Sequence, residues 1–184
     1  PASPDTTFKS VQLNGGVYLL KMATSKRGCI KLQREIRVLQ AMPQTGSHPN
    51  ILHQIPCKVL IDNSIERAII SRLGVDMHDL IHVSKSGMSS KICRHVALHL
   101  LCGLHHLHNN GIAHNDIKPE NIFVNRRFRG EVPRPEPPVP PTSCGRVCVL
   151  GDFGWSHDSR ELYTKLAVGT KPYCAPELLG EKPI

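Results

Sequence analysis

The sequence predicts an α+β protein with two lobes, a small antiparallel sheet with one helix followed by a mainly helical lobe. Two β-prone runs, 8–13 and 17–22, flank an Asn-Gly step, which is a strong hairpin signal. Past Gly74 the pattern changes, and over residues 89–109 apolar side chains recur at helical spacing. The sheet therefore comes first along the chain, and the helical part follows it.

The other elements of the first lobe follow in order. Residues 31–42 place their apolar side chains on one face of a helix, and Pro43 ends it. Two further strands, expected at 51–59 and 67–73, complete the sheet. The first lobe is therefore expected to span residues 8–73, with ordered structure beginning near residue 8.

The second lobe is expected over residues 74–184, within one partial domain that covers the whole chain. Its long helix can be capped by Ser89 or Ser90 and is ended by Gly111. Residues 130–145 contain six prolines, which neither a helix nor a central strand accepts. This segment is expected to be an inserted surface loop, and a docking site for a proline-recognising partner is the alternative.

Composition limits the possible partners. The apolar fraction of 40% supports a globular core, and the formal net charge of +8 permits a nucleic acid, an anionic membrane or an acidic substrate without selecting one. Basic residues form only short clusters such as 126–129, with few aromatics between them, so no nucleic-acid partner is expected. No apolar run reaches the ~18 residues of a membrane span, so no membrane partner is expected either.

Cysteine usage indicates the compartment. The seven cysteines are an odd number and are scattered, which argues against a disulfide framework. Cys144 and Cys148 lack a second pair at zinc-ligand spacing. The sequence therefore predicts reduced thiols in an intracellular protein of the cytoplasm, the nucleus or both.

One group of residues has the chemistry of phosphoryl transfer. Asp116 is followed closely by Lys118 and Asn121, and Asp152 lies in a Gly-Asp-Phe-Gly step. Phosphoryl transfer needs a carboxylate to accept the proton of the attacking hydroxyl, oxygen ligands for Mg²⁺, and a cation near the transferred group. These four side chains could supply all three.

Several motifs together resemble the protein kinase family, in the serine/threonine class. Residues 114–121 read His-Asn-Asp-Ile-Lys-Pro-Glu-Asn and resemble the catalytic loop, and 152–154 read Asp-Phe-Gly and resemble the magnesium loop. Residues 169–177, Gly-Thr-Lys-Pro-Tyr-Cys-Ala-Pro-Glu, resemble the end of the activation segment. Further upstream lie a strand lysine, Lys21, a helix glutamate, Glu35, and a His-Pro-Asn-Ile run at 48–51.

The resemblance implies ATP and Mg²⁺ as cofactors and proteins as substrates. Lys21, paired with Glu35, would position the phosphates, and Asp116 would be the base. The remaining roles fall on these residues: Lys118 near the transferred group, Asn121 and Asp152 as metal ligands, Thr170 at the peptide substrate, Ile70 as gatekeeper, and Ser71 to Leu73 as the hinge that holds adenine.

The expected function is therefore transfer of the ATP γ-phosphate to serine or threonine hydroxyls of proteins. A pseudokinase that acts as a binding or scaffolding module is the main alternative. A small-molecule phosphotransferase would share the aspartates, but the Gly-Thr to Ala-Pro-Glu segment is a peptide-substrate feature.

The chain departs from the family pattern at four places. Residues 1–8 contain no glycine where a glycine-rich phosphate loop is expected, and Leu19 replaces an alanine at the roof of the adenine pocket. Asn115 replaces the arginine that binds an activation-segment phosphate, so activity is expected not to require phosphorylation there. The sequence given stops at Ile184, so the second lobe is expected to be incomplete.

Overall fold

The computed structural model describes most of the chain. The described residues are 5–13, 16–42, 48–61, 64–72, 75–84, 87–126, 146–158 and 169–176. Four predicted features lie outside them: the proline-rich segment 130–145, Leu73 of the hinge, the Asn-Gly step at 14–15 and the glutamate of the Ala-Pro-Glu run.

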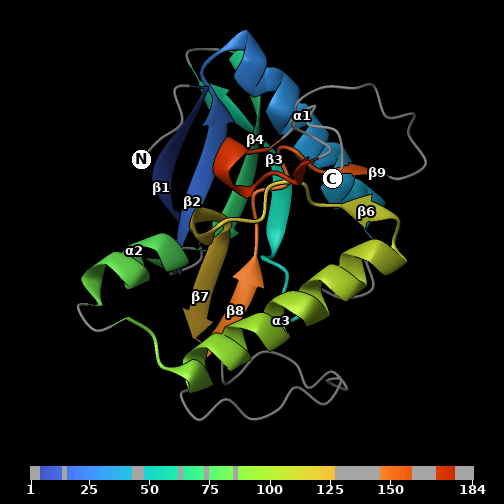
Figure 1. Ribbon diagram of the computed structural model, residues 1–184. Coiled ribbons are helices and arrows are strands. Elements are labelled where there is room, and N and C mark those ends of the chain that lie inside the picture. The colour runs from blue at the N-terminus through green and yellow to red at the C-terminus, as the bar shows by residue number, and fades with distance from the viewer. Residues whose placement is uncertain are drawn as a thin grey trace.

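Four antiparallel strands form the first sheet, in the spatial order β1-β2-β4-β3 (Figure 1). The strands are β1 (Thr6–Leu13), β2 (Gly16–Ala23), β3 (Gln54–Ile61) and β4 (Ser64–Arg72). The first two pair in register from Thr6 opposite Ala23 to Leu13 opposite Gly16. The predicted hairpin is confirmed, and its first strand begins slightly earlier than expected.

Helix α1 (Lys26–Ala41) packs against this sheet. Ser25 caps its start, because Ser25 Oγ accepts a hydrogen bond from the backbone N–H of Gly28 at 3.0 Å. The predicted start at residue 31 is wrong. The first turn exposes residues such as Arg27 and Ile30, so it carries no apolar face that a periodicity argument could detect.

The two faces of the sheet have different surroundings, because successive side chains of a strand point to opposite sides. One face carries a buried cluster that includes Leu20 and Ala68. The other face buries Ile69 against Leu32 and Ile36 of α1. Helix α1 therefore covers only one side of the sheet.

The second part of the chain combines helices with short strands. Its elements are β5 (Val75–Asp76), α2 (Met77–Val83), α3 (Ser90–Asn109), β6 (Ile112–Ala113), η1 (Pro119–Asn121), β7 (Ile122–Arg126), β8 (Arg146–Leu150), β9 (His157–Asp158) and η2 (Lys171–Tyr173). The strands form a β5-β7-β8 sheet and a β6-β9 pair. In Figure 1 the long helix α3 runs along the side of β7 and β8 that lies away from the first sheet.

The helix predicted over residues 89–109 is confirmed as α3, whereas α2 was not predicted. Ser89 caps α3 as expected, and its Oγ accepts from the N–H of Ile92. Helix α2 is short, and its start depends on Asp76, whose carboxylate accepts from the N–H of Asp79 at 2.8 Å. Two turns of helix carry too few residues for a helical period to stand out in the sequence.

Residues 50–52 join the first sheet to the second part. The carbonyl of Asn50 accepts from the N–H of Leu150 at 2.9 Å, and the N–H of Leu52 donates to the carbonyl of Leu150 at 2.8 Å. The side chain of Asn50 also donates to the carbonyl of Cys148 at 3.0 Å. The strand predicted from residue 51 therefore begins only at Gln54, because the preceding residues pair with β8 instead.

The main core lies where these parts meet. Its buried members come from α1, the 50–52 segment, α2, α3 and the strands beyond, and they are Val38, Ile51, Met77, Leu107, Ile112, Ile122, Cys148, Leu150 and Phe153. Phe153 and Leu150 are fully buried, with 0% exposure. The Asp-Phe-Gly step is thus fixed in the core through its middle residue.

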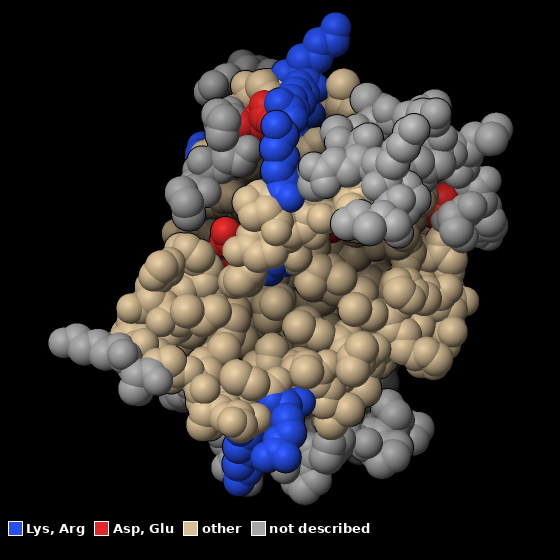
Figure 2. All heavy atoms as spheres, in the orientation of Figure 1, with Lys and Arg blue, Asp and Glu red and all other residues tan. Residues whose placement is uncertain are grey.

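The surface shows two further properties. Among the described residues, no helix has both the length and the apolar composition that a bilayer crossing requires. On the face drawn in Figure 2, Lys and Arg side chains gather near two opposite ends, and mostly neutral residues cover the area between them. On that face the described basic residues do not form one continuous band.

We expect Leu150→Ala to lower the free energy of unfolding by about 2–5 kcal/mol, because it opens a cavity at the junction of the two parts. Leu101→Ala on α3 is the matched control, since Leu101 is 64% exposed, and it should change stability by less than about 0.5 kcal/mol. Urea unfolding measures both values. Equal losses in the two variants would contradict this description of the core.

Candidate active site

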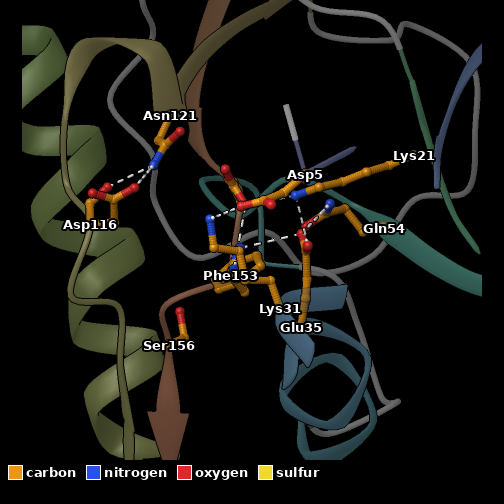
Figure 3. Close-up of polar contacts among 12 residues, drawn as sticks. Asp5, Lys21, Lys31, Glu35, Gln54, Asp116, Asn121, Phe153 and Ser156 are labelled. Atoms are coloured by element: carbon orange, nitrogen blue, oxygen red, sulfur yellow. Dashed lines mark hydrogen bonds and ion pairs between the residues drawn. The ribbon is translucent and has the colours of Figure 1, made fainter. Parts of the chain in front are cut away.

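Lys21 lies at the centre of the first group of polar residues. Its Nζ donates to Glu35 Oε2 at 2.8 Å and to Asp152 Oδ1 at 2.7 Å (Figure 3). Lys21 belongs to β2, Glu35 belongs to α1 and Asp152 follows β8, so one cation joins three segments. The side chain of Glu35 is fully buried, whereas that of Asp152 is 38% exposed. Asp152 is therefore the carboxylate of this group that meets solvent.

Burial and charge act in opposite directions on this group. Desolvation raises the pKa of Glu35 above its usual value, although Lys21 opposes the shift. Desolvation would also raise the pKa of Asp152, but the charge of Lys21 outweighs it and lowers that pKa. Burial would lower the pKa of Lys21, yet the two carboxylates raise it. Lys21 consequently stays charged, and Glu35 is the carboxyl group that takes up a proton more readily.

Two further groups hold Glu35 in place. Glu35 Oε1 accepts from Gln54 Nε2 at 3.0 Å and from the backbone N–H of Phe153 at 3.3 Å (Figure 3). Gln54 belongs to no motif and was not among the predicted site residues. Its role follows from strand pairing. Gln54 lies opposite Ser71, and Ser71 lies opposite Leu19, which is two residues before Lys21 on β2. Gln54 therefore lies on the same sheet face as Lys21.

Asp116 is the centre of the second group. Its carboxylate accepts from Thr170 Oγ1 at 2.7 Å through Oδ1 and from Asn121 Nδ2 at 3.0 Å through Oδ2. Lys118 Nζ lies 3.1 Å from Asp116 Oδ2 and donates to Thr170 Oγ1 at 2.8 Å. The structure therefore brings together four of the predicted site residues, and Figure 3 shows Asn121 turned toward Asp116.

Backbone contacts join the two groups. The N–H of Gly151 donates to the carbonyl of Asn121 at 3.0 Å, which places Asp152 beside Asn121. A ring nitrogen of His114 lies 3.1 Å from the carbonyl of Gly151. Asp152 has a φ of 62°, a left-handed conformation that aspartate tolerates better than most residues do. The catalytic loop and the magnesium loop therefore form one unit.

The donors at this junction fit a magnesium ion. Because Asn121 uses its Nδ2 to bind Asp116, its Oδ1 is the atom able to ligate a cation. The half-exposed carboxylate of Asp152 is adjacent. Both offer oxygen, which is the ligand type that Mg²⁺ prefers.

The predicted gatekeeper, Ile70, is a wrong assignment. Ile70 lies opposite Leu20 and packs with the cluster on the sheet face away from Lys21. Residues directly opposite one another on paired strands share a face, so the residues on the face of Lys21 are Ile69, opposite Lys21 itself, and Ser71. Ser71 keeps its predicted position beside the site, and Leu73 is not among the described residues.

The end of the activation segment packs against the catalytic loop. Gly169 has a φ of 92°, and a Cβ on it would lie 2.4 Å from the carbonyl oxygen of Asn115. Only glycine allows this approach, and it sets Thr170 within reach of Asp116. Asn115 itself, where the family has arginine, contacts a ring nitrogen of His157 at 2.7 Å and donates to the carbonyl of Trp155 at 3.2 Å.

Three features define the protein kinase class of fold. They are a four-stranded sheet covered on one side by a helix, the Lys21–Glu35 pair between this sheet and this helix, and the loop that carries Asp116. The chain belongs to the protein kinase family, because residues 13–184 match the family described as "Protein kinase domain". The solved structure of a kinase domain superposes with a TM-score of 0.73 and 18% sequence identity, over 97% of this chain and 55% of that one.

Curated relatives are kinases as well. "MAPK/MAK/MRK overlapping kinase" of Homo sapiens is 30% identical over 90% of this chain and 35% of its own length. "Calcium/calmodulin-dependent protein kinase type IV" of Mus musculus is 30% identical over 93% of this chain and 32% of its own length. "Serine/threonine-protein kinase cds1" of Schizosaccharomyces pombe is 28% identical over 89% and 31%. The chain spans about a third of the length of these relatives.

We expect Lys21→Met to destabilise the protein more at pH 8 than at pH 5. Without the cation, two neighbouring carboxylates remain, and the pKa of Glu35 rises further. A folded-state pKa raised above the unfolded value gives stability at low pH that is lost as pH rises through the folded pKa.

Urea unfolding at the two pH values measures this difference. Lys58→Met is the control, because Lys58 is exposed on β3, and its effect should be the same at both pH values. A pH-independent loss in Lys21→Met would show that Lys21 does not compensate the carboxylates.

Proposed function

We propose that this chain is the catalytic part of a serine/threonine protein kinase, which transfers the γ-phosphate of ATP to hydroxyl groups of protein substrates. The observation that carries the proposal is the contact set around Asp116, which joins Lys118, Asn121 and Thr170. Residues 8–73 would be the N-lobe and hinge, and residues 74–184 the start of the C-lobe with its proline-rich insertion.

Asp116 would act as the base. Its Oδ1 accepts a hydrogen bond from the hydroxyl group of Thr170 at 2.7 Å, so the carboxylate is oriented to receive a hydroxyl hydrogen. A substrate serine or threonine that approaches the same carboxylate would lose its proton to it as the oxygen attacks. Lys118, which contacts both Asp116 and Thr170, would then lie beside the group being transferred.

The choice of serine and threonine as acceptors rests on two points. The Lys-Pro-Glu-Asn form of the catalytic loop places Lys118 where it holds Thr170, and this contact supports acceptors that present an aliphatic hydroxyl. One of the relatives above, cds1 of Schizosaccharomyces pombe, is named as a serine/threonine-protein kinase.

ATP and Mg²⁺ complete the proposal as cofactors. Mg²⁺, when bound, would offset the phosphate charge, and Asn121 and Asp152 would hold it. Lys21 would orient the phosphates from β2, kept in place by Glu35. The backbone at Ser71 would meet the adenine, on the sheet face that also carries Lys21.

The partners and compartment follow from the same reading. We propose protein substrates, an intracellular location in cytoplasm or nucleus, and no nucleic-acid or membrane partner. The proline-rich segment 130–145 remains a candidate for docking a proline-recognising protein.

A pseudokinase is the second candidate, and Leu19 favours it. Leu19 lies opposite Ser71 on the face of Lys21, so its side chain faces the place where adenine would sit. A leucine there fills space that a smaller residue would leave to the base. The protein would then use the fold for binding and would transfer no phosphate.

We expect Asp116→Asn to lower kcat by about 10²–10⁴-fold, the usual contribution of a general base, while the KM for ATP changes little. Glu66→Gln is the control, because Glu66 is exposed on β4. The assay follows transfer from ATP in the presence of Mg²⁺, with phosphoamino-acid analysis of the product.

Phosphoserine or phosphothreonine made by the wild type and lost only in Asp116→Asn would support the proposal. No transfer and no ATP binding by the folded wild type would move the assignment to the pseudokinase. Phosphotyrosine as the product would overturn the choice of serine and threonine as acceptors but not the kinase activity.

A further inference from the structure

We propose that Lys31 is a positioning residue, which ties helix α1 to the N-terminal segment at Asp5 and to the magnesium loop at Trp155. Through α1 it keeps Glu35 in reach of Lys21. The functional consequence rests on the proposed kinase activity, whereas the contacts themselves can be tested without it.

The first of these two contacts is an ion pair between Asp5, in the N-terminal segment, and Lys31 of α1. Lys31 Nζ donates to Asp5 Oδ2 at 3.1 Å, and Ser25 Oγ donates to Asp5 Oδ1 at 2.8 Å. The side chains of Asp5 and Lys31 are only 16% and 22% exposed, so solvent screens their pair less than it would an ordinary surface pair. Asp5 thus binds the cap and the second turn of the helix together.

The backbone of Asp5 is held as tightly as its side chain. Its carbonyl accepts from the N–H of Thr24 at 3.0 Å. A Cβ on Gly28 would lie 1.8 Å from the same carbonyl oxygen, so only glycine lets α1 approach this closely. These contacts make Asp5 a fixed anchor for Lys31.

The second contact is with the magnesium loop. Lys31 Nζ lies 5.0 Å from the centre of the Trp155 ring, within the range of a cation–π interaction. A Cβ on Gly154 would lie 3.8 Å from Lys31 Cβ, which shows how closely α1 passes this loop. Figure 3 shows Lys31 and Glu35 reaching from the same helix toward the magnesium loop.

Spacing along α1 gives these contacts their effect. Lys31 and Glu35 are four residues apart and share one face of the helix. Glu35 binds the N–H of Phe153, and Lys31 covers Trp155 two residues later. Two contacts fix the rotation of α1 relative to the magnesium loop, whereas a single contact would leave α1 free to turn about it.

The same loop residue reaches the catalytic loop. The carbonyl of Trp155 accepts from Asn115 Nδ2 at 3.2 Å, and Asn115 directly precedes Asp116. A continuous set of contacts therefore leads from Asp5 through Lys31 and Trp155 to the residue before the proposed base.

Trp155 is the only tryptophan of the sequence, so it reports on this contact directly. We expect Lys31→Met to raise the acrylamide quenching constant of Trp155 and to lower kcat by about tenfold, the size of a single cation–π or coupling contact. Lys31→Arg should restore both, since guanidinium can pair with Asp5 and stack on the indole ring. Lys26→Met on the exposed side of α1 is the matched control and should change neither.

Asp5→Asn removes the ionic partner and leaves Lys31 in place, so it should shift quenching in the same direction by a smaller amount. This variant decides the question if Lys31→Met fails to fold. Unchanged quenching in both variants, or a change that Lys26→Met reproduces or Lys31→Arg does not restore, would overturn the proposal. If even the wild type transfers no phosphate, the proposed function fails, and the quenching series still tests the contact.

Discussion

The ion pairs of the largely buried ammonium group of Lys21 determine how the first sheet, helix α1 and the magnesium loop are arranged. This ammonium group pairs with two carboxylates, Glu35 and Asp152, that belong to segments far apart along the chain. Buried ion pairs contribute little net stability, but removing one partner is costly because a charge remains uncompensated. The sheet, helix α1 and the magnesium loop must therefore adopt one mutual arrangement whenever all three groups are charged.

The second group, around Asp116, depends on the first through the backbone. The carbonyl of Asn121 accepts a hydrogen bond from the N–H of Gly151, so a shift of Asp152 would also displace the loop that carries Asp116. Gly169 completes the arrangement by letting Thr170 approach from the activation segment. The residues proposed to hold phosphate and metal and the residue proposed to take the acceptor proton thus lie close together, which is what in-line transfer requires.

Much of the site can be predicted from sequence, because the motifs place chemically distinctive residues at fixed spacings. Lys21 and Glu35 meet as expected, and so do Lys118 and Thr170. The predictions fail where the direction of a side chain depends on how the strands pair. The predicted gatekeeper, Ile70, lies on the sheet face away from Lys21, because a shift of one residue along a strand reverses the side to which a side chain points.

The other omissions have a similar cause. The role of Gln54 depends on strand pairing, the first turn of α1 lacks an apolar pattern, and the link from Asp5 to Lys31 joins residues that no motif connects. A double-mutant cycle between Lys21→Met and Glu35→Gln, measured by urea unfolding, shows whether Lys21 and Glu35 depend on each other. We predict that the two costs are non-additive by at least about 1 kcal/mol, whereas costs that add within about 0.5 kcal/mol would contradict it.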